Sequence, residues 1–136
     1  MAEQARALLD ASALVAWLKE ERGADTIDRL MPVCAISSVN LAESLERASV
    51  TAWRLDNTIT DLLAYGLTVL PFETDDAAQV PIVRRAGRAL SKDGTNALSL
   101  GDCCCIATAR RHGLPVITDD SAWSALDLGV KVHLFR

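Results

Sequence analysis

Aromatic residues are scarce in this chain, and apolar residues never run for long. The 136 residues include three Trp, two Phe and one Tyr, although half are hydrophobic, mostly Ala, Leu and Val. Such an aliphatic mixture suits helices packed on a sheet and provides no aromatic platform for stacking bases. No apolar stretch reaches the roughly 20 residues that span a bilayer, and no basic segment leads into one at the start. We therefore expect one cytoplasmic domain over residues 1–136.

Positive charge is not in excess either. The chain contains 14 Lys and Arg against 18 Asp and Glu, for a net charge of -4. Purely electrostatic binding to nucleic acid depends on basic residues that displace counterions from phosphates, so the composition argues against that mode. A nuclease is not excluded, because divalent cations held by clustered acids can supply positive charge locally.

The cysteines lack the spacing of a disulfide framework or a zinc site. Cys34 stands alone, whereas Cys103, Cys104 and Cys105 are consecutive. Three consecutive residues on one expected helix point in different directions and do not present paired metal ligands. We expect reduced cysteines buried in the core, as in a reducing compartment.

The chain alternates short apolar stretches with amphipathic ones. The expected strands cover residues 7–9, 32–36, 67–70, 114–117 and 131–135. The expected helices begin near Ser12 and at Ser37 or Ser38 and further cover residues 24–30, 52–64, 75–90 and 99–112, with a short helical piece after residue 121. Pro81 should fall in a first turn or at a kink, and residues 91–97 should form a polar loop. This alternation favours an α/β fold with a mostly parallel sheet covered on both faces.

Four acids fall where such a sheet forms its ligand cleft, beyond the carboxyl ends of the strands. Asp10 follows the first expected strand, Glu43 lies near the start of the helix after the second, and Asp120 follows the strand that ends at residue 117. Asp102 begins the helix before that strand and joins the others if its helix starts at the same edge. The pattern predicts one cluster of carboxylates.

Taken singly, several of these acids have a structural explanation. Asp10 could cap the helix that follows it, and Asp102 could complete a capping box with Ser99. Either Asp119 or Asp120 could cap the short helical piece after the turn. The functional hypothesis therefore depends on the acids being gathered together.

Neighbouring polar residues offer support to the acids. Asn40 lies three positions before Glu43 on the same helix face, so its amide could orient the carboxylate or a water. Glu43 could instead pair with Arg47 one turn later, an interaction of about 0.2–0.5 kcal/mol. Ser12 and Thr118 could donate hydrogen bonds to acids, although cap and turn roles are favoured for both.

Clustered carboxylates repel one another, and a cation offsets that repulsion. Their hard oxygens suit Mg²⁺ or Mn²⁺, which bind phosphate oxygens and activate water. The acids therefore predict a metal-dependent phosphodiester hydrolase without a protein nucleophile. A carboxylate could also accept the proton, and either one or two metals fits the spacing.

Other polar and aromatic residues are weaker candidates. A basic stretch could contact RNA phosphates, although a solvated helix face is favoured: Arg84, Arg85, Arg88 and Lys92. Core or interface packing is favoured over base stacking for the tryptophans, Trp17, Trp53 and Trp123. Neither His112 nor His133 has a catalytic partner in the sequence.

Several segments together resemble PIN-domain nucleases of the VapC toxin type. The resemblance rests on LLDASALVAWL around Asp10, on SSVNLAESL with Asn40 and Glu43, and on LSLGDCCCIATARRHGLPVITDD, which begins before Asp102. It covers nearly the whole chain. The chain departs from the family pattern in a longer start before the first strand and in the triple cysteine.

This resemblance implies a three-layer α/β/α sandwich and Mg²⁺- or Mn²⁺-dependent cleavage of RNA. It also implies a homodimer controlled by a cognate antitoxin. Asp10, Glu43 and Asp102 match the family's metal-binding acids, and the Thr-x-Asp pattern selects Asp120 as the fourth. Asp119 holds the variable middle position and is a possible contributor.

The sequence lacks residues that other functions of α/β domains require. A receiver-type signalling domain needs an Asp after its third strand, where this chain has Leu70-Pro71-Phe72-Glu73. A haloacid-dehalogenase-like phosphatase needs a second Asp two positions after Asp10, where Ser12 stands. A noncatalytic protein-binding module with the same fold is the remaining alternative.

Overall fold

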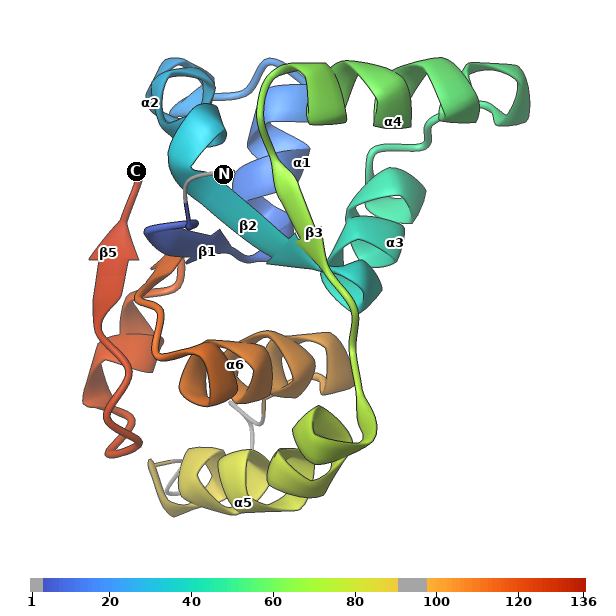
Figure 1. The fold of residues 1–136 in the computed structure, drawn as a ribbon. Helices are drawn as coiled ribbons and strands as arrows, with labels where there is room; N and C mark the ends of the chain where they lie inside the picture. The colour runs from blue at the N-terminus through green and yellow to red at the C-terminus, as the bar shows by residue number, and fades with distance from the viewer. Residues whose placement is uncertain (1–3, 91–97) are drawn as a thin grey trace.

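The computed structural model describes residues 4–90 and 98–136, so the predicted polar loop at 91–97 lies outside the described residues. Within this part, one sheet crosses the molecule (Figure 1). Its strands are β1 (Ala7–Leu9), β2 (Cys34–Ser37), β3 (Thr68–Leu70), β4 (Val116–Thr118) and β5 (Val132–Leu134). They are arranged in the order β3-β2-β1-β4-β5, and every pair is parallel.

The central strand, β1, lies between β2 and β4. Leu8 is in register with Ala35 of β2 on one side and with Val116 of β4 on the other. Strand order reverses at β1, because β2 and β3 extend to one side and β4 and β5 to the other. In parallel sheets such a reversal opens a crevice at the carboxyl ends of the strands.

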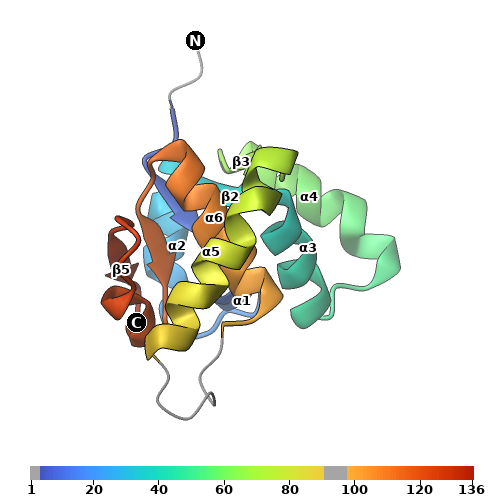
Figure 2. The ribbon, with the colours of Figure 1, turned by 90° about the horizontal axis from the view of Figure 1, so that it is seen from below.

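Helices cover both faces of the sheet, as the sequence predicts. One face carries α1 (Ala11–Leu18), α2 (Ala24–Leu30), α3 (Ser38–Arg47) and α4 (Leu55–Ala64); the other carries α5 (Thr74–Leu90) and α6 (Leu100–His112) (Figures 1 and 2). Successive strand residues point to opposite faces. Leu9 accordingly packs with α1 and α2, and Leu8 packs with α6. The fold is a three-layer α/β/α sandwich.

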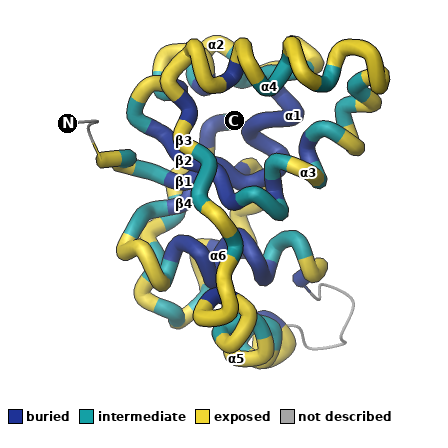
Figure 3. Tube along the Cα trace, turned by 45° about the vertical axis from the view of Figure 1, so that its right-hand side comes forward, coloured by how far each residue is buried: buried dark blue, intermediate teal, exposed yellow. Residues whose placement is uncertain are grey.

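The core lies in two layers beside the sheet, and the outer side of α5 is exposed (Figure 3). All four cysteines are buried and free, as predicted. Trp123 is buried, and Trp17 packs edge-on against Tyr65. Trp53 does not pack in the core, because the residue is 79% exposed, and interface packing stays a prediction for it. In the described ranges, no helix combines the length and apolar character needed to cross a membrane.

Several predicted boundaries and positions differ from those in the structure. The strand predicted at residues 32–36 begins only at Cys34, after a 3₁₀ turn over Met31–Val33. Pro32 has no N–H to donate to a strand ladder, which accounts for the late start. Pro81 lies well inside α5, so the first-turn position is wrong, and a kink at Pro81 stays a prediction. The predicted helix over 52–64 likewise divides into a 3₁₀ turn, Ala52–Arg54, and α4.

A buried carboxylate joins α5 to α6. Asp76 is fully buried and accepts hydrogen bonds from Arg111 Nε at 2.5 Å and from Arg111 Nη2 at 3.1 Å. Its Oδ2 also accepts the Glu73 N–H at 2.8 Å. Burial alone would raise the pKa of Asp76, but these hydrogen bonds and the Arg111 charge hold that pKa below its usual range. Asp76 thus holds α6 against α5.

Replacing Asp76 with Asn should lower the free energy of unfolding by about 1–3 kcal/mol at pH 7, because a charge-assisted pair is lost. A lowered pKa means that Asp76 stabilises the fold above pH 4, and this contribution disappears as the pH falls through the folded-state value. Urea unfolding of D76N and wild type should therefore converge below pH 4. The exposed neighbour Asp75 provides the control, D75N; equal losses in both variants would contradict the assignment.

Candidate active site at the carboxyl edge of the sheet

The carboxylate of Asp10 lies at the end of the central strand and is 5% exposed. Its Oδ1 accepts hydrogen bonds from Ser12 Oγ at 2.6 Å and from the Ala13 N–H at 2.9 Å. Its Oδ2 accepts one from Thr118 Oγ1 at 2.5 Å. Burial raises the pKa of Asp10 to about 6, and the nearby charge of Asp119 adds to the rise. A cation beside Asp10 would offset that cost.

The carboxylate of Glu43 lies against the start of α6. Asn40 Nδ2 donates to Glu43 Oε1 at 3.2 Å and to the carbonyl oxygen of Gly101 at 3.0 Å. A Cβ at Gly101 would lie 2.7 Å from Glu43 Oε1 and 2.8 Å from Oε2. Glycine at this position therefore gives the carboxylate its space. The alternative ion pair between Glu43 and Arg47 is not formed among the described residues.

Asp102 completes a capping box at the N-terminus of α6. Its Oδ2 accepts the Ser99 N–H at 3.1 Å, and its own N–H donates to Ser99 Oγ at 3.0 Å. The predicted cap is therefore formed. Because the helix begins beside Glu43, capping and proximity to the other acids occur together.

Two residues of α6 place the start of this helix between Asp10 and Glu43. Cys105 is fully buried, and its Sγ lies 3.9 Å from the carbonyl oxygen of Leu9, the residue before Asp10. Gly101 of the same helix lies against the Glu43 carboxylate. Burial raises the pKa of Cys105 well above its usual range, and the negative charges of Asp10, Asp102 and Glu43 raise it further.

The turn after β4 carries the remaining acids. The Asp120 N–H donates to Thr118 Oγ1 at 3.1 Å, and Asp120 Oδ1 caps a 3₁₀ turn, Ser121–Ala125, by accepting the Ala122 N–H at 3.0 Å. Asp119 instead binds Arg136, whose Nη2 lies 2.9 Å from Asp119 Oδ2. The cap predicted for Asp119 or Asp120 thus belongs to Asp120.

The donor chemistry of these residues fits a hard divalent cation. Carboxylate oxygens predominate, and the Oδ1 of Asn40 is buried without a hydrogen-bond partner among the described groups. Across residues 4–90 and 98–136, however, no three Asp, Glu, His or Cys side chains stand close enough together to hold one ion.

Three residues that shape the candidate site cannot be found from the local sequence pattern: Gly101, Cys105 and Arg136. Their partners lie far away in sequence, so helical spacing does not connect them. Arg84 and Arg88 lie on the part of α5 that packs near the start of α6, because Gly87 between them packs against Leu98. The charges of both arginines oppose the rise that burial causes in the pKa of Cys103.

A PIN domain model matches residues 7–128 of the chain. The fold is similar to a chain of a toxin-antitoxin complex from Klebsiella pneumoniae, with a TM-score of 0.71 and 22% identity over 96% of this chain and 98% of that one. A chain of DNA-bound VapBC from Salmonella typhimurium also has a TM-score of 0.71, with 20% identity over 98% of this chain and all of that one.

VapBC-5 from Mycobacterium tuberculosis, described as a member of the VapBC family of toxin-antitoxin systems, has a TM-score of 0.56. It shares 26% identity over 97% of this chain and 98% of that one. Among curated proteins, none matches the chain.

The buried Asp10 carboxyl predicts how stability depends on pH. A folded-state pKa of about 6 exceeds the ordinary value of 3.8, so Asp10 favours the fold most below pH 4 and this contribution is lost as the pH rises through 6. In EDTA, the unfolding free energy of wild type should fall by about 2 kcal/mol relative to D10N between pH 4 and pH 7. Urea unfolding at both pH values measures this; parallel pH profiles would contradict it.

Proposed function

The chain belongs to the PIN domain family, and from this premise we propose that it is a Mg²⁺- or Mn²⁺-dependent endoribonuclease. The observation that carries the proposal is the position of the start of α6, which holds Asp102: Gly101 lies against Glu43, and Cys105 lies against Leu9, the residue before Asp10. This arrangement lies at the carboxyl end of the central strand, at the edge of the sheet where parallel sheets bind ligands.

Asp10, Glu43 and Asp102 would hold the cation, with Asp120 as the fourth acid. When bound, such a cation stabilises negative charge on a phosphate and makes water a stronger nucleophile at neutral pH. Asp10 is held in place by three donors, and Glu43 is oriented by Asn40. Preorganised carboxylates of this kind require little rearrangement during the reaction.

The surroundings of Asp102 support a polyanionic substrate. Arg84 and Arg88 lie on either side of Gly87, the position at which α5 packs against Leu98 just before α6 begins. Guanidinium groups bind phosphate oxygens and fix the register of a nucleic acid without reading its bases. These two residues would place an RNA backbone beside the acids, although the chain as a whole is acidic.

We further propose that the protein is the toxin of a toxin–antitoxin pair and acts as a homodimer in the cytoplasm. Its similarity to VapBC chains supports this role. An antitoxin encoded beside it would bind the folded domain and keep it from RNA. The competing function is a noncatalytic binding module, in which the same acids only cap helices. The two functions differ in whether the protein cleaves RNA and whether cleavage requires these acids.

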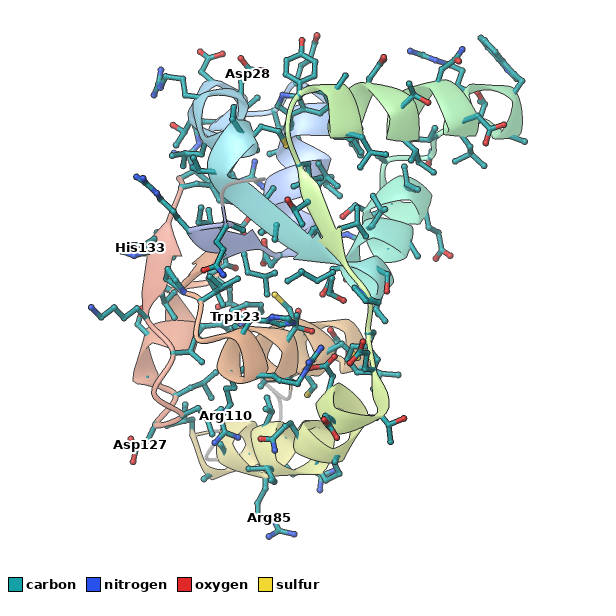
Figure 4. The ribbon with its side chains drawn as sticks, in the orientation of Figure 1. Asp28, Arg85, Arg110, Trp123, Asp127 and His133 are labelled. Carbon is teal, nitrogen blue, oxygen red and sulfur yellow. The ribbon has the colours of Figure 1, made fainter. Side chains whose placement is uncertain are left out.

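Replacing Asp10 or Asp102 with Asn should reduce RNA cleavage about a hundredfold or more, because each change removes a carboxylate from the metal site. Asn retains an acceptor for the Ser99 N–H, so the cap at Asp102 survives. Cleavage of a fluorogenic RNA in Mg²⁺ or Mn²⁺ measures the effect. The matched control is D127N, since Asp127 extends away from the body of the molecule (Figure 4).

EDTA should abolish wild-type cleavage, and added Mn²⁺ should restore it. Folded D10N and D102N that cleave as fast as wild type would refute the proposed site. Wild-type protein that is folded, free of any inhibitor and inactive on RNA with either metal would favour the noncatalytic module.

Gly101 provides a test of how Glu43 is placed. In G101A the new Cβ would meet both carboxylate oxygens at under 3 Å, so the flexible side chain of Glu43 must move. We expect a cleavage rate at least about tenfold lower, with the free energy of unfolding changed by under about 1 kcal/mol. Cleavage and urea unfolding are measured on the same preparation. The control is G129A, where no atom lies within 4 Å of the added Cβ, although its φ of +72° makes some loss of stability expected.

A further inference from the structure

Arg136 connects three segments that are far apart in sequence. Its Nε and Nη2 donate to Asp119 Oδ2 at 3.2 and 2.9 Å. Its Nη1 donates to the Arg22 carbonyl oxygen at 3.0 Å and to Glu21 Oε1 at 3.4 Å. The guanidinium thereby fastens the end of β5 to the turn after β4 and to the loop after α1.

The residue that Arg136 binds lies beside the site. The Asp119 N–H donates to Ser12 Oγ at 3.3 Å, and the same hydroxyl donates to Asp10 Oδ1 at 2.6 Å. The charge of Asp119 also acts on Asp10. Asp119 is therefore joined to Asp10 through the Ser12 hydroxyl, and both of the guanidinium contacts to it fall on Oδ2, which leaves its Oδ1 without a contact to Arg136.

We propose that Arg136 is a positioning residue that keeps the Asp119 carboxylate in an ion pair and out of the metal-binding set around Asp10. This inference rests on the metal site of the proposed function. It gives Asp119 and Asp120 different roles. Arg136 neutralises the charge of Asp119, whereas Asp120, which caps the 3₁₀ turn through Oδ1, keeps its Oδ2 for the cation. Asp119 and Asp120 carry the same charge and are adjacent in sequence. The contact with Arg136, which follows β5, is what gives them different roles.

The proposal predicts the sign of a change that structural damage would not produce. In R136Q, Asp119 gains a free negative charge and a repelling positive charge disappears, so Mn²⁺ should bind about tenfold more tightly. Loosening of the site would instead weaken binding. Removing both charges in D119N/R136Q should return the Mn²⁺ affinity to within about threefold of wild type, because the pair contributes no net charge and Asp119 is not a ligand.

Isothermal titration with MnCl₂ measures these affinities, and thermal unfolding confirms that each variant is folded. R85Q makes the same charge change on a side chain that extends away from α5 (Figure 4), and its affinity should match that of wild type. R136K keeps the positive charge at position 136 but cannot donate two hydrogen bonds to Asp119 in the fixed geometry of a guanidinium. Its affinity for Mn²⁺ should remain within about threefold of wild type. It tests the charge even if R136Q does not fold, and a tenfold change in R136K would overturn the proposal.

The D10N variant distinguishes a failure of the metal site from a failure of the role of Arg136. Mn²⁺ binding that is present in wild type and lost in D10N establishes the metal site. With that site established, an R136Q affinity equal to or weaker than wild type would overturn the role of Arg136 alone. A tenfold loss in D119N/R136Q would place Asp119 among the ligands and overturn it as well. Wild type that binds no Mn²⁺ would overturn both this inference and the proposed function.

Discussion

The rest of the site depends on the burial of one carboxylate at the end of the central strand. Placing an anion in the interior costs several kcal/mol unless hydrogen bonds or a cation compensate it. Asp10 receives three hydrogen bonds, two from the first turn of α1 and one from Thr118 at the end of β4. Those donors meet only if β1 lies directly beside β4, so the strand order and the protection of this carboxylate require each other.

Helix capping and metal binding are compatible uses of the same acids. A carboxylate has two oxygens, each with more than one lone pair. Asp102 uses Oδ2 for the Ser99 N–H, and Asp120 uses Oδ1 for the Ala122 N–H, so each has an oxygen that these caps do not occupy. The caps restrict how these side chains rotate and thereby preorganise them. The caps predicted for Asp10, Asp102 and Asp120 are formed, and they leave the proposed function of these acids intact.

Two ion pairs hold the segments that carry the acids. Asp76 and Arg111 fasten α6, which carries Asp102, to α5. Arg136 and Asp119 fasten the turn after β4 to neighbouring segments. Both positive partners lie outside the cluster, so they stabilise its supports without neutralising the cluster itself.

The sequence by itself determined the elements and their caps, because periodicity, Gly, Ser and Asp act within a turn or two of their own position. It also placed Asp10 and Asp120 at strand ends. It predicted a strand from Pro32 that begins only at Cys34, and it left core and interface packing open for Trp53, since local patterns do not report which backbone groups or surfaces a neighbour supplies.

Only the tertiary structure decided which distant residues meet: Thr118 with Asp10 across 108 positions, Gly101 with Glu43, and Arg136 with Asp119. Such contacts follow from strand order and from which face each helix covers, and no local spacing encodes either.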